Sequence, residues 1–350
     1  MSRILFVCPD LDQPAGGIKQ IYRQVDVLNQ LGLNAYVLHG HKNFRVTWFN
    51  NKTPVLWDYR VTKIDAVKSK LTIRSFMRGI RTFKFKKHAK AILEITNKDI
   101  VVLPEFYGKD LEEAFKDFKT VIYNQNCYYS FRGYNTTNNI DNSIYNQDRL
   151  KAVIVASEDA TKYLNTFLAK PLFRVKYGID SSIFKYNKNK KKQIAYMPRK
   201  LWEDAIQVFN IMHYNNIFKD WNIVPISGLN EAEVARILGE SAIFLSFNHR
   251  EGFGMPPAEA MACGCVVVGY KGQGGTEIFK PDFSYPVQDR NITTFVTTLT
   301  NVIQLFEEDK SKFLAKGKLA STFIDENYNM QAEIKTINDV WTEILKISKQ

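Results

Sequence analysis

Two glutamates with seven residues between them carry the most specific chemical signal in this sequence. Glu251 and Glu259 lie in the segment AIFLSFNHREGFGMPPAEAMACG, and Gly252, Phe253 and Gly254 directly follow the first of them. Carboxylates accept hydrogen bonds from hydroxyl groups, so the pair suits a polyol such as a sugar or a ribose. The glycines let a ligand approach the backbone closely. We therefore expect a site for a hydroxyl-rich ligand here.

A second glycine-rich loop follows, Gly272-Gln273-Gly274-Gly275-Thr276-Glu277. Its backbone N–H groups could bind an anion. Thr276 and Glu277 could instead simply cap a short helix. The spacing does not fit the G-x-G-x-x-G pattern of dinucleotide-binding loops.

The elements around these loops predict how the carboxylates are placed. An apolar run predicts a strand that ends near Ser246, and Val266–Val268 predicts the next strand. Pro256 and Pro257 favour a helix over Pro257–Cys263 between them, because proline is tolerated at the start of a helix. Glu259 is then expected in the first turn of that helix. Open α/β sheets bind ligands at the carboxyl edge of their strands, where these loops lie.

Strand and helix patterns alternate along the rest of the chain. Ile4–Cys8 predicts a strand, Gly16 and Gly17 follow in a loop, and apolar residues from Ile18 to Leu31 recur at helical spacing. Further strands are expected at 35–38, 100–103, 120–123, 152–156, 193–196, 223–226 and 242–245, and further helices at 203–214, 231–238, 291–307 and 328–348, with Asn230 as an N-cap. Residues 40–62 show no clear period. The lysine-rich stretch Lys185–Lys192 reads as a surface loop. The alternation predicts α/β domains with parallel sheets.

Length and composition favour a two-domain globular protein. The chain has 350 residues, of which 45% are hydrophobic and 24% charged, which excludes a disordered or collagen-like chain. The longest apolar runs are too short to span a bilayer, and the first residues do not resemble a signal peptide. Four cysteines are too few for a disulfide scaffold and suit a reducing, cytoplasmic compartment.

The positive charge is concentrated in the N-terminal half. The formal net charge is +12, and the residues through Gly178 hold 28 Lys and Arg against 16 Asp and Glu. Residues 63–90 alone hold ten Lys and Arg and one acid. This stretch could be a solvated helix face, or it could bind an anionic membrane surface or a phosphorylated, lipid-linked sugar. Nucleic acid is not expected, because no nucleic-acid-binding module is present.

Two further patterns predict no metal. Asp10-Leu11-Asp12 could hold a metal–nucleotide complex, but it lies in the first loop, far from the glutamates. Cys263 and Cys265 have no second cysteine pair, so a zinc site is not expected. Small residues that pack between a helix and a strand explain them better.

The glutamate segment, with GGTE after it, resembles glycosyltransferase family 4, a family of retaining enzymes with the GT-B fold. Other parts of the chain resemble the family in order: Gly16-Gly17, the linker Tyr177-Gly178-Ile179-Asp180 with Phe184, and Arg199 after the strand at 193–196. The resemblance implies two Rossmann-like domains that face a cleft, over residues 1–178 for the acceptor and 179–330 for the nucleotide sugar. It also implies a C-terminal helix, 331–350, that packs back on the first domain.

The resemblance also implies a role for each site residue. Glu259 would bind the ribose of the donor, and Glu251 with the amides of Gly252, Phe253 and Gly254 would bind the donor sugar. Arg199 and Lys200 would hold the diphosphate, with Gly17, Gly274, Gly275 and Thr276 nearby. These cations would neutralise the leaving group, so no divalent metal or other cofactor is expected beside the donor substrate, a UDP-, GDP- or dTDP-linked sugar.

Two departures from the family pattern stand out. The family usually places its Arg and Lys about five residues apart, but here Arg199 and Lys200 are adjacent and residue 204 is Asp. The family often has a histidine on a loop of the first domain, where this chain offers Asn124, Gln125 and Asn126. Retaining members are thought to use the leaving phosphate as the base, so the absence of this histidine does not exclude transfer.

The sequence therefore predicts a retaining, metal-independent glycosyltransferase, which moves a sugar to an acceptor hydroxyl in surface glycan or glycolipid synthesis. Its partners would be a nucleotide sugar and a glycan or lipid-linked acceptor, with a peripheral membrane association through residues 63–90. Two alternatives remain: a GT-B nucleotide-sugar epimerase or hydrolase, and a degenerate transferase that only binds a membrane or a partner.

Overall fold

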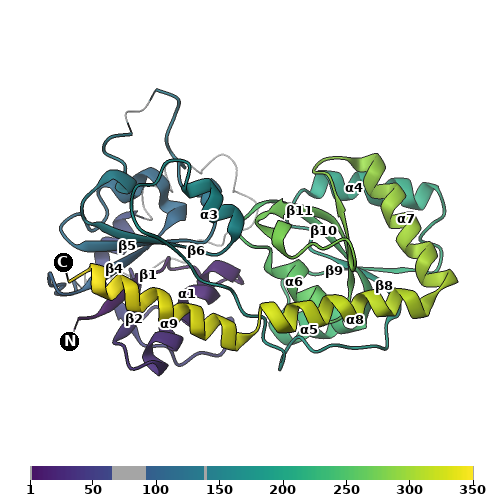
Figure 1. Ribbon diagram of the computed structural model, residues 1–350, viewed down its shortest axis with the longest axis horizontal. Coiled ribbons are helices and arrows are strands. Elements are labelled where there is room, and N and C mark those ends of the chain that lie inside the picture. The colour runs from purple at the N-terminus through teal and green to yellow at the C-terminus, as the bar shows by residue number, and fades with distance from the viewer. Residues whose placement is uncertain (1, 65–91, 138–139, 350) are drawn as a thin grey trace. The chain divides into compact units, whose positions relative to one another are not determined.

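The computed structural model describes residues 2–64, 92–137 and 140–349 of the chain (Figure 1). The predicted basic stretch therefore lies, from residue 65 on, outside the described residues. The chain divides into two compact units. Unit 1 comprises Met1–Val155, Thr161–Val175 and Thr336–Gln350, and unit 2 comprises Ala156–Ala160 and Lys176–Lys335.

Unit 1 is built on a seven-stranded sheet with the order β3-β2-β1-β4-β5-β6-β7. Every pairing in it is parallel. The strands are β1 (Ile4–Val7), β2 (Ala35–His39), β3 (Val55–Trp57), β4 (Ile100–Pro104), β5 (Lys119–Asn124), β6 (Leu150–Val155) and β7 (Leu172–Arg174). All four residues of β1 are buried, as the continuous apolar run of a central parallel strand predicts.

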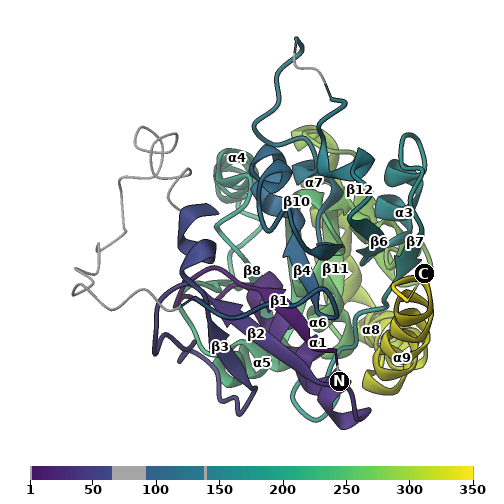
Figure 2. The same cartoon turned by 90° about the vertical axis from the view of Figure 1, so that its left-hand side faces the viewer.

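The helices of unit 1 are short, apart from the first and the last. They are α1 (Gly16–Gln30), η1 (Glu105–Glu112), η2 (Cys127–Tyr129), η3 (Ile144–Asn146) and α3 (Glu158–Leu164). The residues of α3 up to Ala160 are assigned to unit 2, and those from Thr161 on to unit 1. The last helix, α9 (Met330–Ile347), begins in unit 2, and its residues from Thr336 belong to unit 1. Trp341 of α9 is fully buried, with its ring centroid 5.7 Å from that of Phe6 in β1. Figure 2 shows the end of this helix beside the sheet of unit 1.

Unit 2 is built on a five-stranded parallel sheet with the order β12-β11-β10-β8-β9. The strands are β8 (Lys191–Tyr196), β9 (Asn222–Pro225), β10 (Ser241–Glu251), β11 (Val266–Gln273) and β12 (Ser284–Val287). Because all of them run in one direction, their carboxyl ends meet at a single edge. The chain reverses its direction of sheet growth between β8 and β10. This switch point is where open α/β sheets bind ligands.

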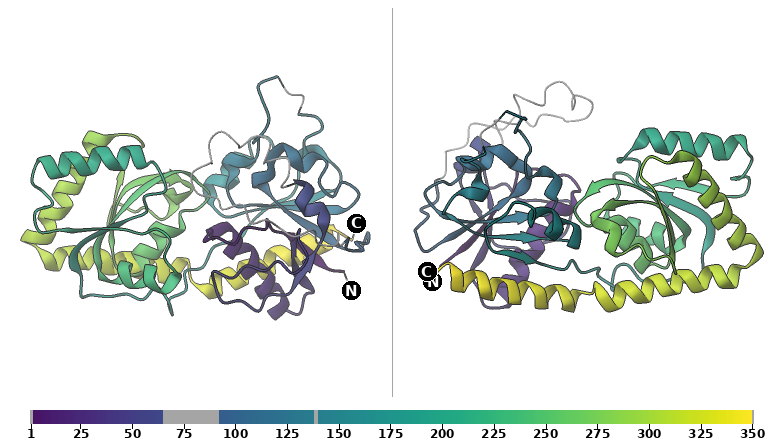
Figure 3. Two further views of the ribbon diagram at one scale, coloured as in Figure 1. Left: turned by 180° about the vertical axis from the view of Figure 1, so that it is seen from behind. Right: turned by 45° about the horizontal axis from the view of Figure 1, so that its top comes forward.

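Helices cover both faces of the sheet in unit 2 (Figures 1 and 3). On one face lie α4 and α7, and on the other lie α5, α6 and α8. Their bounds are α4 (Trp202–Tyr214), α5 (Glu231–Glu240), α6 (Met255–Ala262), α7 (Ile292–Glu308) and α8 (Lys310–Asn327), with the short turn η4 (Gly274–Glu277) after β11. Asn230 caps α5 in a reciprocal capping box with Glu233, so the predicted N-cap is confirmed.

The expected α/β fold with two parallel, Rossmann-like sheets is confirmed, but several elements were missed. They are the short strands β3, β7 and β12, the helices α3 and α8, and the short helices η1, η2 and η3. Each of the three strands has four residues or fewer and lies at the end of its sheet, where a weak pattern is sufficient because one side is unpaired. The apolar spacing of α8 is diluted by four lysines, which hid its period.

Lys190 corrects the prediction of a surface loop over Lys185–Lys192. Lys191 and Lys192 begin β8, and Lys190 is only 5% exposed. Its ammonium donates to the carbonyl oxygens of Leu238, Gly239 and Cys263 at 3.0, 3.1 and 2.8 Å. This lysine therefore satisfies the carbonyls at the ends of α5 and α6.

Gly178, in the predicted linker, is held against the start of α9. Its N–H donates to the Glu333 carboxylate at 2.9 Å, and Glu333 is 1% exposed. A Cβ at residue 178 would lie 2.8 Å from that carboxylate oxygen and 2.9 Å from the carbonyl oxygen of Asn329. The glycine is therefore required by close packing inside unit 2.

Candidate functional site in unit 2

Lys200 and Glu251 form an ion pair at the switch point of the unit 2 sheet. Lys200 follows the carboxyl end of β8, Glu251 is the last residue of β10, and the Lys200 Nζ contacts Glu251 Oε1. The two side chains are 33% and 20% exposed, so both are reachable from solvent. The sequence predicted both residues for the site, and the structure brings them into direct contact.

The strand that carries Glu251 is longer than predicted. The pattern ended it near Ser246, but β10 continues to Glu251, which pairs with Gln273 of β11 after an irregularity beyond Asn248. Arg250, inside this irregularity, has a φ of +49°. The strained residue re-aims the end of the strand, as bulges near functional sites do. The carboxylate is thus fixed by the sheet instead of lying in a free loop.

Backbone strain gathers at this edge of the sheet. Seven non-glycine residues among the described parts of the chain have a positive φ, and four of them lie at or just beyond the carboxyl ends of β8, β10, β11 and β12. They are Leu201, Arg250, Gln273 and Arg290, with φ values of +38°, +49°, +62° and +65°. Such conformations cost of order 1 kcal/mol each and persist where the surroundings enforce them, often at functional sites.

The two glycine-rich loops pack directly on each other. A Cβ at Gly274 would collide with the carbonyl oxygens of Gly252 and Glu251, whereas one at Gly275 would lie 3.5 Å from the carbonyl oxygen of Phe253. Gly254 has a φ of +96° and precedes α6. The loops can approach this closely only because residue 274 carries no side chain. Within η4, Thr276 is exposed, whereas Gly274 and Gly275 are buried.

Phe253 lies in the predicted sugar-binding segment, but its side chain is 3% exposed. Its ring centroid is 5.7 Å from that of Tyr177 and 5.2 Å from that of Tyr328. The ring therefore fixes the loop to the linker region of unit 2. Only the backbone of Phe253 is in a position to contact a ligand.

The helix that carries Glu259 begins two residues earlier than predicted. Gly254 is the N-cap of α6, Met255 is its first residue, and the two prolines occupy the next positions. Prolines fit there because the first-turn N–H groups have no partner inside the helix. Glu259 is therefore in the second turn, not the first, and it is half-buried. Its placement on the helix does not depend on the dipole at the helix start.

Arg199 is exposed in the turn after β8, next to the Lys200–Glu251 pair. Residue 204, where the family pattern has a lysine, is an aspartate that faces the same edge. The Tyr270 hydroxyl donates to Asp204 Oδ2 at 2.9 Å, and Arg290 Nη1 donates to Asp204 Oδ1 at 2.9 Å. Burial, followed by the neighbouring Asp204 carboxylate, raises the pKa of Tyr270, so the hydroxyl stays protonated and continues to donate.

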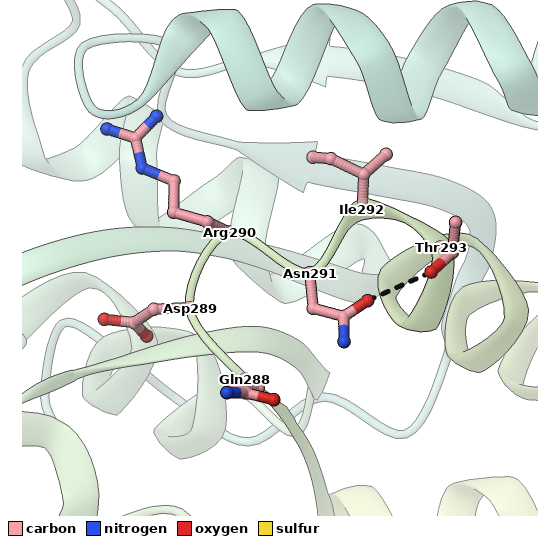
Figure 4. A pocket seen from close by; sticks show the side chains of 6 residues that line it. All are labelled: Gln288, Asp289, Arg290, Asn291, Ile292 and Thr293. Carbon is pink, nitrogen blue, oxygen red and sulfur yellow. Dashed lines mark hydrogen bonds between the residues drawn. The ribbon is translucent and has the colours of Figure 1, made fainter.

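Sequence reasoning missed the loop after β12. Residues 288–293 line an open hollow of about 410 Å³ (Figure 4). Gln273 connects this loop to the site: its Nε2 donates to Asp289 Oδ2 at 2.9 Å, and its Oε1 accepts from the Arg250 N–H at 3.0 Å. His249 Nδ1 lies 3.7 Å from the same carboxylate. The sequence did contain a sign of this loop: an acid and a base, Asp289 and Arg290, are adjacent directly before a helix pattern.

The site residues predicted in unit 1 have partners there. Gly17 lies in the first turn of α1, and its carbonyl oxygen accepts from Gln125 Nε2 at 3.0 Å. Asn124 Nδ2 donates to Ser130 Oγ at 2.9 Å, and Asn126 Oδ1 accepts from the Tyr128 N–H at 3.1 Å. The Asn124 and Asn126 side chains thus have structural roles, and Gln125 bridges the β5 loop to the start of α1.

Internal hydrogen bonds also occupy the carboxylates of the Asp10-Leu11-Asp12 triplet. Asp10 contacts the Nδ1 atoms of His39 and His41 at 3.0 and 2.5 Å, and Asp12 accepts from the Thr47 N–H and hydroxyl at 2.7 and 2.6 Å. Burial raises the pKa of Asp10, but the hydrogen bonds and charge of His39 outweigh this effect, so the net pKa is lowered. Asp10 therefore stays ionised beneath the carboxyl edge of β1 and β2.

The described residues contain no metal-binding cluster, no membrane-spanning helix and no disulfide bond. No group of three or more His, Cys, Asp or Glu side chains is placed to hold a metal ion. None of the helices described in the structure has the length and apolar character needed to cross a membrane. The four cysteines, all among the described residues, are buried and form no disulfide bond, and burial raises the pKa of the Cys263 and Cys265 thiols.

Comparisons with known sequences find a transferase family match that covers part of this site. Residues 222–318 match the family described as Glycosyl transferases group 1. The chain is 33% identical over 187 residues to an alpha-1,6-glucosyltransferase of Actinobacillus pleuropneumoniae serotype 7. That match covers 51% of this chain and 55% of the relative, so the chain spans about half the length of the curated protein that it matches.

Solved structures with the same fold cover nearly the whole chain. A sucrose-phosphate synthase from Thermosynechococcus elongatus superposes with a TM-score of 0.66 at 12% identity, over 99% of this chain and 100% of that one. Anabaena HepE, in complex with UDP and glucose, gives 0.64 at 13% identity, and a variant of S. aureus TarM, in complex with UDP, gives 0.64 at 12%, each over 99% and 100% of the two chains. Part of unit 2 therefore matches the glycosyl transferases group 1 model, and the chain has the two-sheet GT-B fold of these solved structures.

Proposed function

We propose that this protein is a glycosyltransferase of family 4 that moves a sugar, with retention of anomeric configuration, from a nucleoside diphosphate sugar to an acceptor hydroxyl. The observation that carries the proposal is the Lys200–Glu251 pair at the switch point of unit 2, beside two interlocked glycine loops. The transferase domain match spans the Glu251 half of this pair. The solved relatives with bound UDP support a nucleotide donor.

Different residues of unit 2 bind different parts of the donor. Glu259 on α6 binds the ribose hydroxyls, and Glu251 with the backbone of 252–254 binds the sugar hydroxyls. Arg199 and Lys200 bind the diphosphate. Their positive charges stabilise the charge that develops on the diphosphate as the bond to the anomeric carbon breaks.

The transfer step balances without a metal ion or a cofactor. The bond between the anomeric carbon and the diphosphate oxygen breaks, and the bond to the acceptor oxygen forms. The acceptor proton passes to the departing diphosphate, which leaves as the nucleoside diphosphate. Glu251 holds Lys200 at the edge of the sheet before the donor binds, which lowers the entropic cost of placing the cation.

The decisive experiment incubates the chain with UDP-, GDP- and dTDP-linked sugars, beginning with UDP-glucose, with and without EDTA. Nucleoside diphosphate release that depends on an added sugar acceptor, and that persists in EDTA, is expected. NMR of the new anomeric proton reports retention. Donor consumption without an acceptor would indicate an epimerase or hydrolase instead, and the absence of any donor binding would indicate a scaffold.

Matched variants test the site. We expect Glu251→Gln and Lys200→Met to lower kcat/KM for the donor by about 100-fold, the loss of one charged transition-state contact. Glu240→Gln is the control, because Glu240 pairs with Lys191 on the surface of the same unit and lies outside the site. An unchanged rate in Glu251→Gln would contradict the assignment.

We also propose that the acceptor is a glycan or lipid-linked sugar in surface glycan synthesis, and that the protein acts in the cytoplasm at the membrane face. The relative named as an alpha-1,6-glucosyltransferase and the basic stretch at residues 63–90 support this proposal. Flotation with anionic and neutral vesicles tests it. Equal recovery with both would remove the membrane from the proposal.

A further inference from the structure

Asp204 is a buried carboxylate at the start of α4 with both oxygens occupied. It is 6% exposed, Tyr270 donates to one oxygen, and Arg290 donates to the other. Such a carboxylate cannot serve as a base or bind a donor hydroxyl without losing a partner. Its remaining use is to hold the Arg290 guanidinium in place.

The guanidinium of Arg290 is held by a hydrogen bond and is also exposed to solvent. Its side chain is 55% exposed, and its bond to Asp204 uses one of the five N–H donors of the guanidinium. No other hydrogen bond of this side chain is present among the described residues. The φ of +65° at Arg290 is an uncommon conformation for a residue with a side chain. Figure 4 shows the Arg290 and Asp289 side chains leaving the loop on the same side, away from Asn291 and Thr293.

The Arg290 loop is continuous with the proposed donor site. Asp289 is bonded through Gln273 to the Arg250 N–H, directly before Glu251. On the other side, Asp204 is the third residue of α4, four positions after Lys200, which pairs with Glu251. Two independent chains of contacts therefore join Arg290 to the edge at which the diphosphate is proposed to bind.

The exposed guanidinium of Arg290 suits an anionic ligand. Its side chain is 55% exposed, and its planar fork of N–H donors matches the geometry of a phosphate.

We infer that Arg290 binds the diphosphate of the nucleotide donor and that Asp204 is the residue that positions it. The inference rests on the proposed function, because it names a further contact within the same donor site. The contact comes from the loop after β12 and supplements the cations after β8.

The test compares UDP with uridine, which lacks the phosphates, by titration calorimetry and ligand-observed NMR. Arg290→Gly removes the cation and suits the positive φ, so it should fold. We expect it to weaken UDP binding about tenfold or more, the loss of a hydrogen bond to a charged group, and to leave uridine binding within about twofold. Arg290→Lys should retain most of the UDP affinity.

Two further variants complete the design. Arg236→Ala is the matched control, because Arg236 is an exposed arginine of unit 2 that pairs only with Glu240 on its own helix among the described residues. The double variant Asp204→Lys with Arg290→Gly moves the cation onto α4 and should restore UDP binding relative to Arg290→Gly alone.

The outcomes separate the two proposals. If the unaltered protein binds no nucleoside diphosphate, the proposed function fails. If it binds UDP, and Arg290→Gly either leaves UDP binding unchanged or weakens UDP and uridine equally, Arg290 only clamps the loop to α4 and the inference is overturned.

Discussion

Lys190 offers the sharpest test of how unit 2 is held together. Replacing it with methionine keeps the length of the side chain but removes three hydrogen bonds to the carbonyl oxygens of Leu238, Gly239 and Cys263. These carbonyls lie at the ends of α5 and α6, where a cation also interacts favourably with the helix dipoles. At residue 190 the exposed fraction is only 5%, so water cannot readily replace the ammonium.

The magnitude follows from these contacts. Each hydrogen bond that the ammonium donates contributes about 1 kcal/mol, so losing three lowers the free energy of unfolding by about 3 kcal/mol. This is an upper figure, because the Cys263 carbonyl oxygen still accepts from the Asn187 N–H at 3.2 Å and the Leu238 carbonyl oxygen from the Cys265 thiol at 3.0 Å. For a unit of this size each kcal/mol lowers Tm by about 2–4 °C, so we expect a fall of about 6–12 °C.

Thermal unfolding of the full chain, followed by calorimetry, measures this fall. Lys191→Met and Lys192→Met are matched controls from the same run of lysines. Their side chains are 63% and 40% exposed and form surface pairs with Glu240 and Glu307. Surface pairs contribute at most about 1 kcal/mol. If Lys190→Met melts within 2 °C of both controls, the buried network does not stabilise unit 2 and the reasoning is refuted.

Three further predictions test other parts of the structure. Gly178→Ala should lower Tm by several degrees, because its Cβ would lie 2.8 Å from the carboxylate oxygen at the start of α9; an unchanged calorimetric Tm would mean that α9 shifts at no cost. Burial raises the pKa of Asp99, but hydrogen bonds from Arg3 and nearby amides outweigh it and bring the pKa to about 2, below the ordinary value of about 3.9. Its stabilising contribution is therefore complete above about pH 4 and is lost as the pH falls towards 2, so the unfolding free energy difference between the natural chain and Asp99→Asn should shrink over that window in urea titrations. Gly274→Ala should abolish UDP binding in calorimetry while Gly275→Ala retains it, because only the first Cβ collides with the facing loop; equal binding by both would contradict the interlocked loops.

The fold class could be predicted because the apolar pattern repeats within short windows. The runs at β1, β4, β6 and β10 are continuous, and parallel strands buried on both faces need such runs. The N-cap at Asn230 was equally local, since it depends on residues three positions apart. The edge strands β3, β7 and β12 and the helix α8 could not be predicted, because partners far along the chain stabilise them despite weak local patterns.

The candidate site divides in the same way. Glu251, Glu259 and the glycine loops were identifiable from their spacing in the sequence. The pairing of Glu251 with Lys200 joins two strands that are adjacent in the sheet but fifty residues apart in the chain. The Asp204–Arg290 pair spans 86 residues. No local pattern specifies such a pair, because its existence depends on which loops the sheet order brings together.

The sequence by itself determined the two α/β halves, the concentration of positive charge before Ile179 and the two glutamates of the site, because each of these is written in residue type and short-range spacing. Only the tertiary structure decided which charges are used within the protein and which remain exposed. Three consecutive lysines show this: Lys190 is buried under two helix ends, while Lys191 and Lys192 stay at the surface. The physical reason is that burial and pairing of a charge depend on strand order and helix packing, which bring together groups that are distant in the sequence.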